Sequence, residues 1–142
     1  MKNSIVQLHP QNQHLLELFL QKMGNSKHSF RYFESRSLDI LQQHVITLLY
    51  VEDDEPIAYG HLDKEDDIVW LGIAVAENQK GKGLGNKIMQ ALIENAKQLY
   101  VEKIRLSVDK DNAIAIKLYE KFGFKMISEN QKSYFMEKQI EI

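Results

Sequence analysis

The sequence predicts an α/β fold with a mixed, mostly antiparallel sheet of six or seven strands flanked by about four helices. Three segments rich in β-branched and aliphatic residues follow one another between residues 45 and 75 through short polar turns, which is typical of an antiparallel meander. A long amphipathic stretch then leads to another strand segment, which is the pattern of a βαβ unit. The expected element order is βααβββαβαββ, with helices on the faces of the sheet.

The first part of the chain predicts one strand and two helices. Residues 4–8 form a short strand pattern, and Pro10 suits the first turn of a helix. Apolar residues at helical spacing extend that helix to about residue 23, where a Gly-Asn-Ser stretch ends it. Ser37 is expected to cap a short second helix.

The meander strands are expected at Val45–Val51, Ile57–Leu62 and Ile68–Val75. The third strand is apolar on both faces, which predicts a central place in the sheet. Gly72 lies inside it, and a glycine within a strand suggests either a bulge or the close approach of a ligand.

The last part of the chain predicts two helices and three strands. Apolar residues at helical spacing after residue 84 form one stripe. Gly123 is expected to close the second of these helices as its C′ residue. The expected elements are helix 84–99, strand 103–108, helix 112–122 and a final hairpin of strands 124–127 and 134–138.

Composition narrows the function classes. The 142 residues fit one domain spanning 1–142, and 44% hydrophobic with 27% charged residues is ordinary for a soluble protein. A net charge of -2 gives no general attraction to nucleic acid, and the absence of cysteine excludes disulfides, thiolate–zinc sites and a cysteine nucleophile. The first residues lack a signal-peptide pattern, and no apolar run approaches the ~20 residues of a membrane helix. A cytoplasmic protein without nucleic-acid or membrane partners is expected.

Three alternate glycines, Gly81, Gly83 and Gly85, lie between the third meander strand and the long helix. Glycine permits positive φ and lets a ligand approach bare N–H groups, and a helix start carries about +0.5 charge with unpaired donors. Together these features predict an anion site suited to phosphate. The spacing fits neither a P-loop nor the dinucleotide fingerprint, since the required glycines would fall at Asn86 or Ile88. The alternative is a loop that merely turns a strand into a helix.

Here the sequence resembles the GNAT N-acetyltransferase superfamily. The stretch Lys80–Gly85 is similar to the family's pyrophosphate motif, Gln/Arg-x-x-Gly-x-Gly/Ala, with lysine in the first position. The stretch Asn112–Phe124 is similar to the family's Asn-x-x-Ala-x-x-Leu-Tyr-x-Lys-x-Gly-Phe segment. The two motifs stand in the family's order and at a typical separation, and the resemblance covers about residues 45–127. It implies a GNAT-like sheet, which agrees with the element order above.

The resemblance implies acetyl-CoA as cofactor and no metal. Backbone N–H groups at the glycine-rich turn hold the pyrophosphate, and the end of the central strand pairs with the pantetheine arm as an added strand does. Asn112 then donates or accepts a hydrogen bond on that arm. The implied cofactor-binding residues are Ile73, Ala74, Val75, Lys80, Gly81, Lys82, Gly83, Leu84, Gly85, Asn86, Asn112 and Tyr119.

For catalysis the resemblance implies direct attack of a neutral amine on the thioester, with Tyr119 donating a proton to the leaving thiolate. A phenol with pKa about 10 is protonated at neutral pH, and the thiol it forms has pKa about 8.5. The alternative for Tyr119 is a core position. Many relatives carry a glutamate base on the fourth strand, but residues 68–75 include no acid. His61 and Asp63 are the nearest candidate bases; a structural histidine and a surface aspartate are the alternatives.

In this family the first helices and the strand ends build the acceptor site, and Phe30, Arg31, Tyr32 and Arg36 fall in that region. Aromatic rings with arginine can stack on a sugar or bind a carboxylate or phosphate. The alternative is that the aromatics are core and the arginines solvated. The stretches around His61 and Trp70 are similar to acetyltransferases of bacterial sugar metabolism.

The expected substrate is therefore a small-molecule amine, with an amino sugar or its nucleotide as one candidate, ahead of a protein N-terminus or lysine. The rival functions are a protein or peptide N-acetyltransferase, a non-catalytic module that senses acyl-CoA, and a nucleotide-phosphate binding protein of another fold. A monomer or homodimer is expected.

Overall fold

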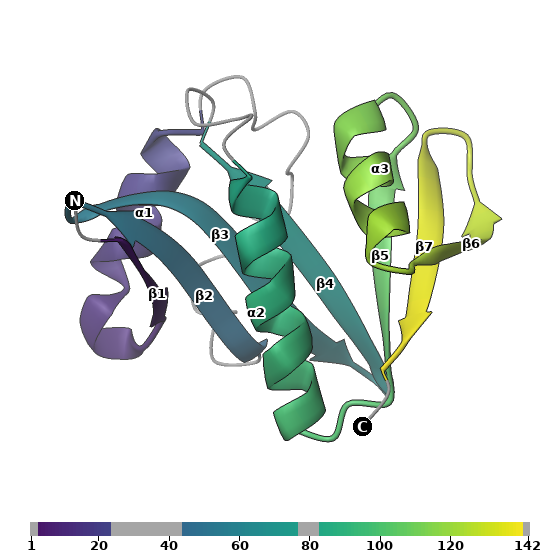
Figure 1. The fold of residues 1–142 in the computed structure, drawn as a ribbon, viewed down its shortest axis with the longest axis horizontal. Coiled ribbons are helices and arrows are strands. Elements are labelled where there is room, and N and C mark those ends of the chain that lie inside the picture. Colours follow the sequence, from purple (N-terminus) through teal and green to yellow (C-terminus); the bar gives the residue numbers. More distant parts are fainter. Residues whose placement is uncertain (1–2, 24–43, 77–82, 141–142) are drawn as a thin grey trace.

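The computed structural model describes residues 3–23, 44–76 and 83–140 (Figure 1). The α/β class and the predicted order of strands are confirmed; the predicted helix near Ser37 lies outside the described residues. The elements are β1 (Asn3–Gln7), the 3-10 helix η1 (Pro10–Asn12), α1 (His14–Gln21), β2 (His44–Glu52), β3 (Glu55–Glu65), β4 (Ile68–Val75), α2 (Leu84–Gln98), β5 (Lys103–Asp109), α3 (Ala113–Lys121), β6 (Lys125–Glu129) and β7 (Ser133–Gln139).

One seven-stranded sheet contains all of these strands, in the order β1-β2-β3-β4-β5-β7-β6. Every neighbouring pair is antiparallel except β4 and β5, which are parallel. The exception follows from the connection, because α2 carries the chain back across the sheet between these two strands. The predicted meander and βαβ unit are therefore both present.

The meander strands are joined by very tight turns. Asp53 and Asp54 both have positive φ, 49° and 69°, which is the conformation of a two-residue type I′ hairpin turn, and Glu52 pairs with Glu55 across it. Asp66 has φ 55° in the turn between β3 and β4. Because these turns are so short, β3 pairs with its neighbours over its whole length and is longer than the predicted strand.

Helix α2 covers one face of the sheet. Its predicted apolar stripe is buried at Leu84, Ile88, Leu92 and Ala96, which belong to the larger core cluster, whereas Leu99 at its end is 49% exposed. Contact with β3 is close at Gly60, where an added Cβ would lie 2.4 Å from Cγ2 of Ile88. The larger cluster draws on β2, β3, β4, β5 and β7, so α2 packs across the centre of the sheet.

Helix α1 contributes to a second core cluster. Leu16 and Phe19 of α1 are buried there with Leu49, Tyr59 and Ala74 from β2, β3 and β4. Side chains alternate across a strand, and Tyr59 belongs to this cluster while its neighbour Ala58 belongs to the larger one. The two clusters therefore lie on opposite faces of the sheet. No helix among the described residues has the length and apolar character needed to cross a membrane.

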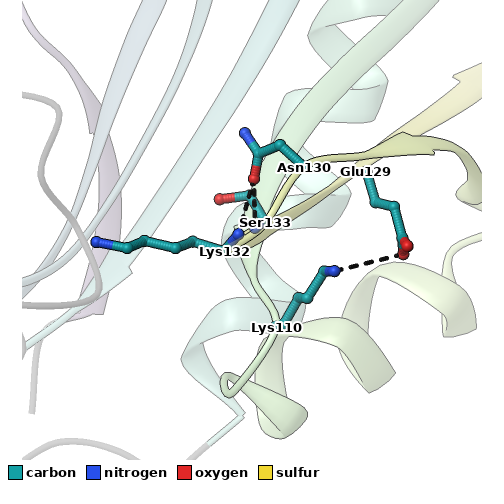
Figure 2. Close-up of polar contacts among 5 residues, drawn as sticks. All are labelled: Lys110, Glu129, Asn130, Lys132 and Ser133. Carbon is teal, nitrogen blue, oxygen red and sulfur yellow. Dashed lines mark hydrogen bonds and ion pairs between the residues drawn. The ribbon is translucent and has the colours of Figure 1, made fainter.

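The β6–β7 hairpin is tied to the end of β5 by polar contacts (Figure 2). Asn130 Oδ1 accepts hydrogen bonds from the backbone N–H groups of Lys132 and Ser133, at 3.0 and 2.8 Å, which shapes the turn. Lys110 Nζ lies 3.6 Å from a carboxylate oxygen of Glu129, and the Lys110 N–H donates to the Lys132 carbonyl. Strands β5, β7 and β6 with α3 thus form one side of the molecule in Figure 1.

Candidate active site

Strands β4 and β5 separate after a short stretch of pairing. They are paired only at Val69↔Ile104 and Trp70↔Arg105 among the described residues. On its other edge β4 stays paired with β3 as far as Val75. Figure 1 shows the two parallel strands meeting at one end and diverging toward the start of α2. Beyond Trp70, the edge of β4 that faces β5 therefore has no strand partner in the described part of the chain.

Helix α2 begins at this divergence with a glycine. Gly83 is its N-cap and has a left-handed backbone, φ 76°, and an added Cβ there would meet no atom within 4 Å in the described part of the chain beyond its neighbours in sequence. Glycine is therefore favoured by backbone conformation rather than by crowding. The first turn of α2 contains no acidic residue, so the positive end of the helix dipole is not offset there. Lys80, Gly81 and Lys82 lie outside the described residues.

Helix α3 lies beside the first turn of α2. An added Cβ on Gly85 would be 3.0 Å from Cδ2 of Leu118, and Lys121 Nζ donates to Asn86 Oδ1 at 2.7 Å. The glycine at position 85 thus permits close helix packing at the place where β4 and β5 diverge. Residues 83–86, expected to hold a pyrophosphate, come together at one helix start; whether they bind one stays a prediction.

Tyr119 is a buried residue of α3, with a relative exposure of 6%. Its ring contacts Phe124 edge to face at a centroid distance of 6.0 Å. Burial raises the pKa of Tyr119 to about 12. Asn112 uses Oδ1 to cap α3, where it accepts the Ala115 N–H at 3.2 Å, so this oxygen already has a structural role. The cofactor contacts expected of Tyr119 and Asn112 stay predictions.

His61 and Asp63 are both buried on β3, with exposures of 2% and 8%. The surface alternative for Asp63 is therefore wrong: the strand continues to Glu65, which keeps Asp63 within the sheet. His61 Nδ1 lies 2.6 Å from the Tyr59 hydroxyl oxygen. Tyr59 is not among the residues predicted from the sequence, although its place two residues before His61 puts both on one face of a strand.

Gly72 makes room for His61. The two residues are direct partners in the β3–β4 register, which is continuous, so the expected bulge in β4 is wrong. A Cβ added to Gly72 would lie 2.6 Å from Cε1 and 2.8 Å from Nε2 of the imidazole. The space that a side chain would take at position 72 is thus filled by a ring from the neighbouring strand.

Polar and aromatic side chains continue along this face of the sheet. Thr47 on β2 is the register partner of His61 and is also buried. Asp63 is the register partner of Trp70, whose ring contacts Phe135 of β7 edge to face at 6.3 Å. The acceptor residues expected from the sequence, Phe30, Arg31, Tyr32 and Arg36, lie outside the described residues.

Comparison with known families identifies the chain. A sequence model described as the Acetyltransferase (GNAT) family matches residues 10–124. The chain belongs to the GNAT acetyltransferase family. The match includes both motifs on which the resemblance depends, and the GNAT family expected from the sequence is confirmed.

Curated GNAT relatives share about half of the chain. The spermine/spermidine N(1)-acetyltransferase of Bacillus subtilis (strain 168) is 41% identical over 69 residues, which cover 47% of this chain and 45% of that protein. The L-amino acid N-acetyltransferase AaaT of Escherichia coli (strain K12) is 39% identical over 63 residues, which cover 44% and 39%. The chain thus matches less than half the length of these relatives.

Solved GNAT structures match nearly the whole fold. The GNAT-family acetyltransferase of Streptococcus pneumoniae has a TM-score of 0.82 at 20% identity and covers 99% of this chain and 100% of its own. The PaiA N-acetyltransferase of Thermoplasma acidophilum, in complex with coenzyme A, has a TM-score of 0.77 at 17% identity, covering 98% and 99%. At these identities the likeness establishes the fold.

Proposed function

We propose that this chain transfers the acetyl group of acetyl-CoA directly to a primary amine of a small molecule, within one domain. The observation that carries the proposal is the divergence of β4 from β5 after Trp70, at the glycine-led start of α2. An unpaired strand edge can hydrogen-bond the amides of a pantetheine arm as an added strand does. A helix start offers N–H donors and positive potential to a diphosphate. The coenzyme A complex of a GNAT protein with the same fold supports this assignment.

The residues proposed to bind the cofactor form two groups, one at the end of β4 and one at the start of α2. Backbone groups of Ile73, Ala74 and Val75 face the pantetheine arm, and the N–H groups of residues 83–86 face the diphosphate. When bound, acetyl-CoA supplies the activated thioester. The chain's task is to hold that thioester along β4, to present the amine to it and to move two protons.

One proton leaves the amine and another reaches the thiolate. An alkyl ammonium with pKa about 10.4 is charged at pH 7, and reaching the neutral form costs roughly 4–5 kcal/mol at 1.36 kcal/mol per unit. His61 is the proposed base, because imidazole titrates near neutral pH and its ring lies against Gly72, two residues beyond the last paired position of β4. Asp63 is the proposed second group, which favours the protonated imidazole. Tyr119 is the proposed proton donor to the thiolate.

The acceptor is proposed as a small-molecule amine, since relatives of the matched segment are named for spermine or spermidine and for L-amino acids. A peptide acceptor is the second candidate. It is supported by an N-alpha-acetyltransferase of Sulfurisphaera tokodaii (strain DSM 16993 / JCM 10545 / NBRC 100140 / 7) that is 38% identical over 58 residues. An amino sugar as the acceptor stays a prediction, because the names of these relatives do not mention one.

The test is release of free thiol from acetyl-CoA in the presence of an amine panel: polyamines, amino acids, amino sugars and short peptides. We expect thiol release above the amine-free rate for at least one small amine, with the acetylated amine found by mass spectrometry. Tight binding of acetyl-CoA without acetylation of any amine would favour the sensor module instead. Stronger thermal stabilisation by ATP than by CoA would favour a nucleotide-binding protein.

A further inference from the structure

We infer that Tyr59 is a positioning residue for His61: its phenol oxygen accepts the Nδ1–H of the imidazole, which leaves Nε2 as the proton-accepting atom toward β4. The inference rests on the proposed function, in which His61 is the base, but it makes a separate claim about the tautomer of one ring.

The Tyr59–His61 hydrogen bond is short and fully enclosed. The hydroxyl oxygen and Nδ1 are 2.6 Å apart, Tyr59 has no exposed surface and His61 has 2%. Phe19 of α1 stacks on the Tyr59 ring at a centroid distance of 6.0 Å and an interplanar angle of 19°. Because the phenol is held between α1 and the sheet, it is a fixed partner for the imidazole rather than a mobile one.

The imidazole also lies against Gly72 of the diverging strand, where an added Cβ would be 2.6 Å from Cε1, 2.8 Å from Nε2 and 3.2 Å from Nδ1. The Cε1–Nε2 edge is the part of the ring closest to the space above Gly72. Gly72 stands just beyond Trp70, the last β4 residue that pairs with β5, where the free edge of β4 begins. With Nδ1 held by Tyr59, Nε2 is therefore the ring atom directed toward the strand on which the thioester is proposed to lie.

Few charged groups face this ring among the described residues. Asp63 is the charged neighbour on β3, whereas β2 presents Thr47 and β4 presents Gly72 and Trp70, the nearest positions on the same face. Helix α1 presents Phe19 to the adjoining tyrosine. A proton taken up at Nε2 thus gives an imidazolium that donates to Tyr59 through Nδ1 and lies on the same strand face as the Asp63 carboxylate.

The proton and electron balance of the step is simple. The acceptor ammonium gives one proton to Nε2, and its nitrogen lone pair forms the N–C bond to the acetyl carbon. The C–S bond breaks with its electron pair on sulfur, and the thiolate takes a proton from Tyr119. The new amide nitrogen loses its second proton, which restores the Tyr119 phenol. The excess proton on His61 returns to solvent before the next turnover.

The first test measures the tautomer without activity. In long-range 15N–1H spectra of the whole protein near pH 8, we expect His61 Nδ1 to be the protonated nitrogen and Nε2 the unprotonated one. Tyr59→Phe removes the acceptor oxygen and should shift the population toward the Nε2–H form. A wild-type ring protonated at Nε2 would overturn the inference, whatever the enzyme acetylates.

The second test is kinetic. Tyr59→Phe should lower kcat about tenfold with unchanged KM for acetyl-CoA, since the phenol is proposed to act on the rate through the base. The matched control is Tyr50→Phe, which removes another buried hydroxyl, on the opposite face, that accepts from Lys87 at 3.3 Å. This control should keep the wild-type kcat.

A double-mutant cycle separates positioning from general destabilisation. In a His61→Ala background, Tyr59→Phe should have no further effect on kcat, because the imidazole that Tyr59 orients is absent. An equal loss in both backgrounds, or a wild-type kcat for Tyr59→Phe alone, contradicts the inference. Failure of the wild type to acetylate any amine rejects the proposed function instead, and the tautomer measurement still decides the inference.

Discussion

Tyr119 illustrates how burial alone prepares a side chain for one chemical role. Its phenol lies in the larger core cluster, and burial raises its pKa to about 12. A phenol with that pKa keeps its proton at every pH at which an enzyme of this kind works. In the resting enzyme it does not lose its proton to water, so it is available to donate to the thiolate, and the activity should show no basic limit arising from Tyr119.

We predict that Tyr119→Phe lowers kcat by about 100-fold, the lower range for loss of a general acid. The affinity for acetyl-CoA should change little, because the ring and its contact with Phe124 are retained. Single-turnover kinetics combined with calorimetric titration of acetyl-CoA separates the two quantities. An unchanged turnover rate would remove Tyr119 from the mechanism.

The same pKa predicts how stability depends on pH. Tyr119 binds its proton more tightly in the folded state than in the unfolded chain, where its pKa is about 10. The resulting contribution to the free energy of unfolding is fully present below pH 10 and is lost between pH 10 and pH 12. It amounts to about 3 kcal/mol at 1.36 kcal/mol per unit. Urea unfolding at pH 9 and pH 12 should show a larger loss of stability for wild type than for Tyr119→Phe; equal losses would contradict the burial argument.

For His61 the prediction concerns the pKa of the acceptor. His61→Ala should reduce kcat/KM by about 100-fold for an alkylamine and by much less for an amine of pKa near 7, which reaches its neutral form without help. In wild type, kcat/KM should fall toward acid pH, because the base is then protonated. Rates for a series of amines of graded pKa measure both effects. A loss independent of amine pKa would assign His61 to structure.

Single residues could be predicted where their positions follow from the local sequence, but not where they depend on how two strands pair. The positions of His61 and Asp63 on one strand follow from local alternation, and the sequence identifies them as candidates. Their burial and the filling of the Gly72 space by an imidazole depend on the register between β3 and β4. The register is set by turn geometry and by the whole pattern of packed faces. Of the two alternatives for Gly72, a bulge or the close approach of a ligand, the bulge is wrong and the second stays a prediction.

At the level of elements, the start of α2 combines a left-handed glycine with an open space where its side chain would be. Gly83 has φ 76°, and among the residues that the structure describes no atom outside its chain neighbours lies within 4 Å of an added Cβ. The space therefore admits a ligand against the backbone, and a side chain at this position would extend into it. The geometry makes substitution at residue 83 a direct probe of the anion site.

We predict that Gly83→Glu weakens CoA binding at least 100-fold, because a carboxylate then competes with the diphosphate for the N–H groups of the first turn. Gly83→Gln is the matched control for size and for the strain of positive φ, which costs about 1–3 kcal/mol in either variant. It should bind CoA more tightly than Gly83→Glu by at least tenfold. Isothermal titration measures both; equal affinities for the two variants would show that charge at this helix start is irrelevant.

Elements with a long regular pattern were predicted best. Helix α2 spans Leu84–Gln98 where 84–99 was expected, and the bounds of β4 agree with the prediction. Strand β3 runs beyond its prediction at both ends, because aspartates with positive φ at residues 53, 54 and 66 make tighter turns than the composition indicates. The separation of β4 from β5 depends on how α2 returns the chain across the sheet, and it entered the prediction only through the family resemblance.

The whole molecule consists of two parts of one sheet that meet along a short seam. Strands β1–β4 carry α1 and α2, strands β5–β7 lie next to α3, and two register pairs between β4 and β5 join them (Figure 1). A cofactor seated between β4 and β5 touches both parts. It should therefore stabilise the folded molecule as a unit rather than one loop.

We predict a single thermal unfolding transition that moves upward with acetyl-CoA. At a concentration of 100 times Kd the stabilisation is about 2.7 kcal/mol, or about 8 °C for a chain of this size. ATP at the same concentration should give a clearly smaller shift, since it has no pantetheine arm to pair with β4. Scanning calorimetry with each ligand measures this; an equal shift with ATP contradicts the assignment of the β4 edge.

The most direct measurement is a crystal structure of this protein grown with acetyl-CoA. We expect the diphosphate against the N–H groups of residues 83–86, the pantetheine amides paired with residues 73–75 of β4, and the thioester between β4 and β5, where His61 approaches from one face of the sheet and Tyr119 from the other. A complex in which the start of α2 holds no phosphate, or in which acetyl-CoA lies away from the β4 edge, would contradict this expectation.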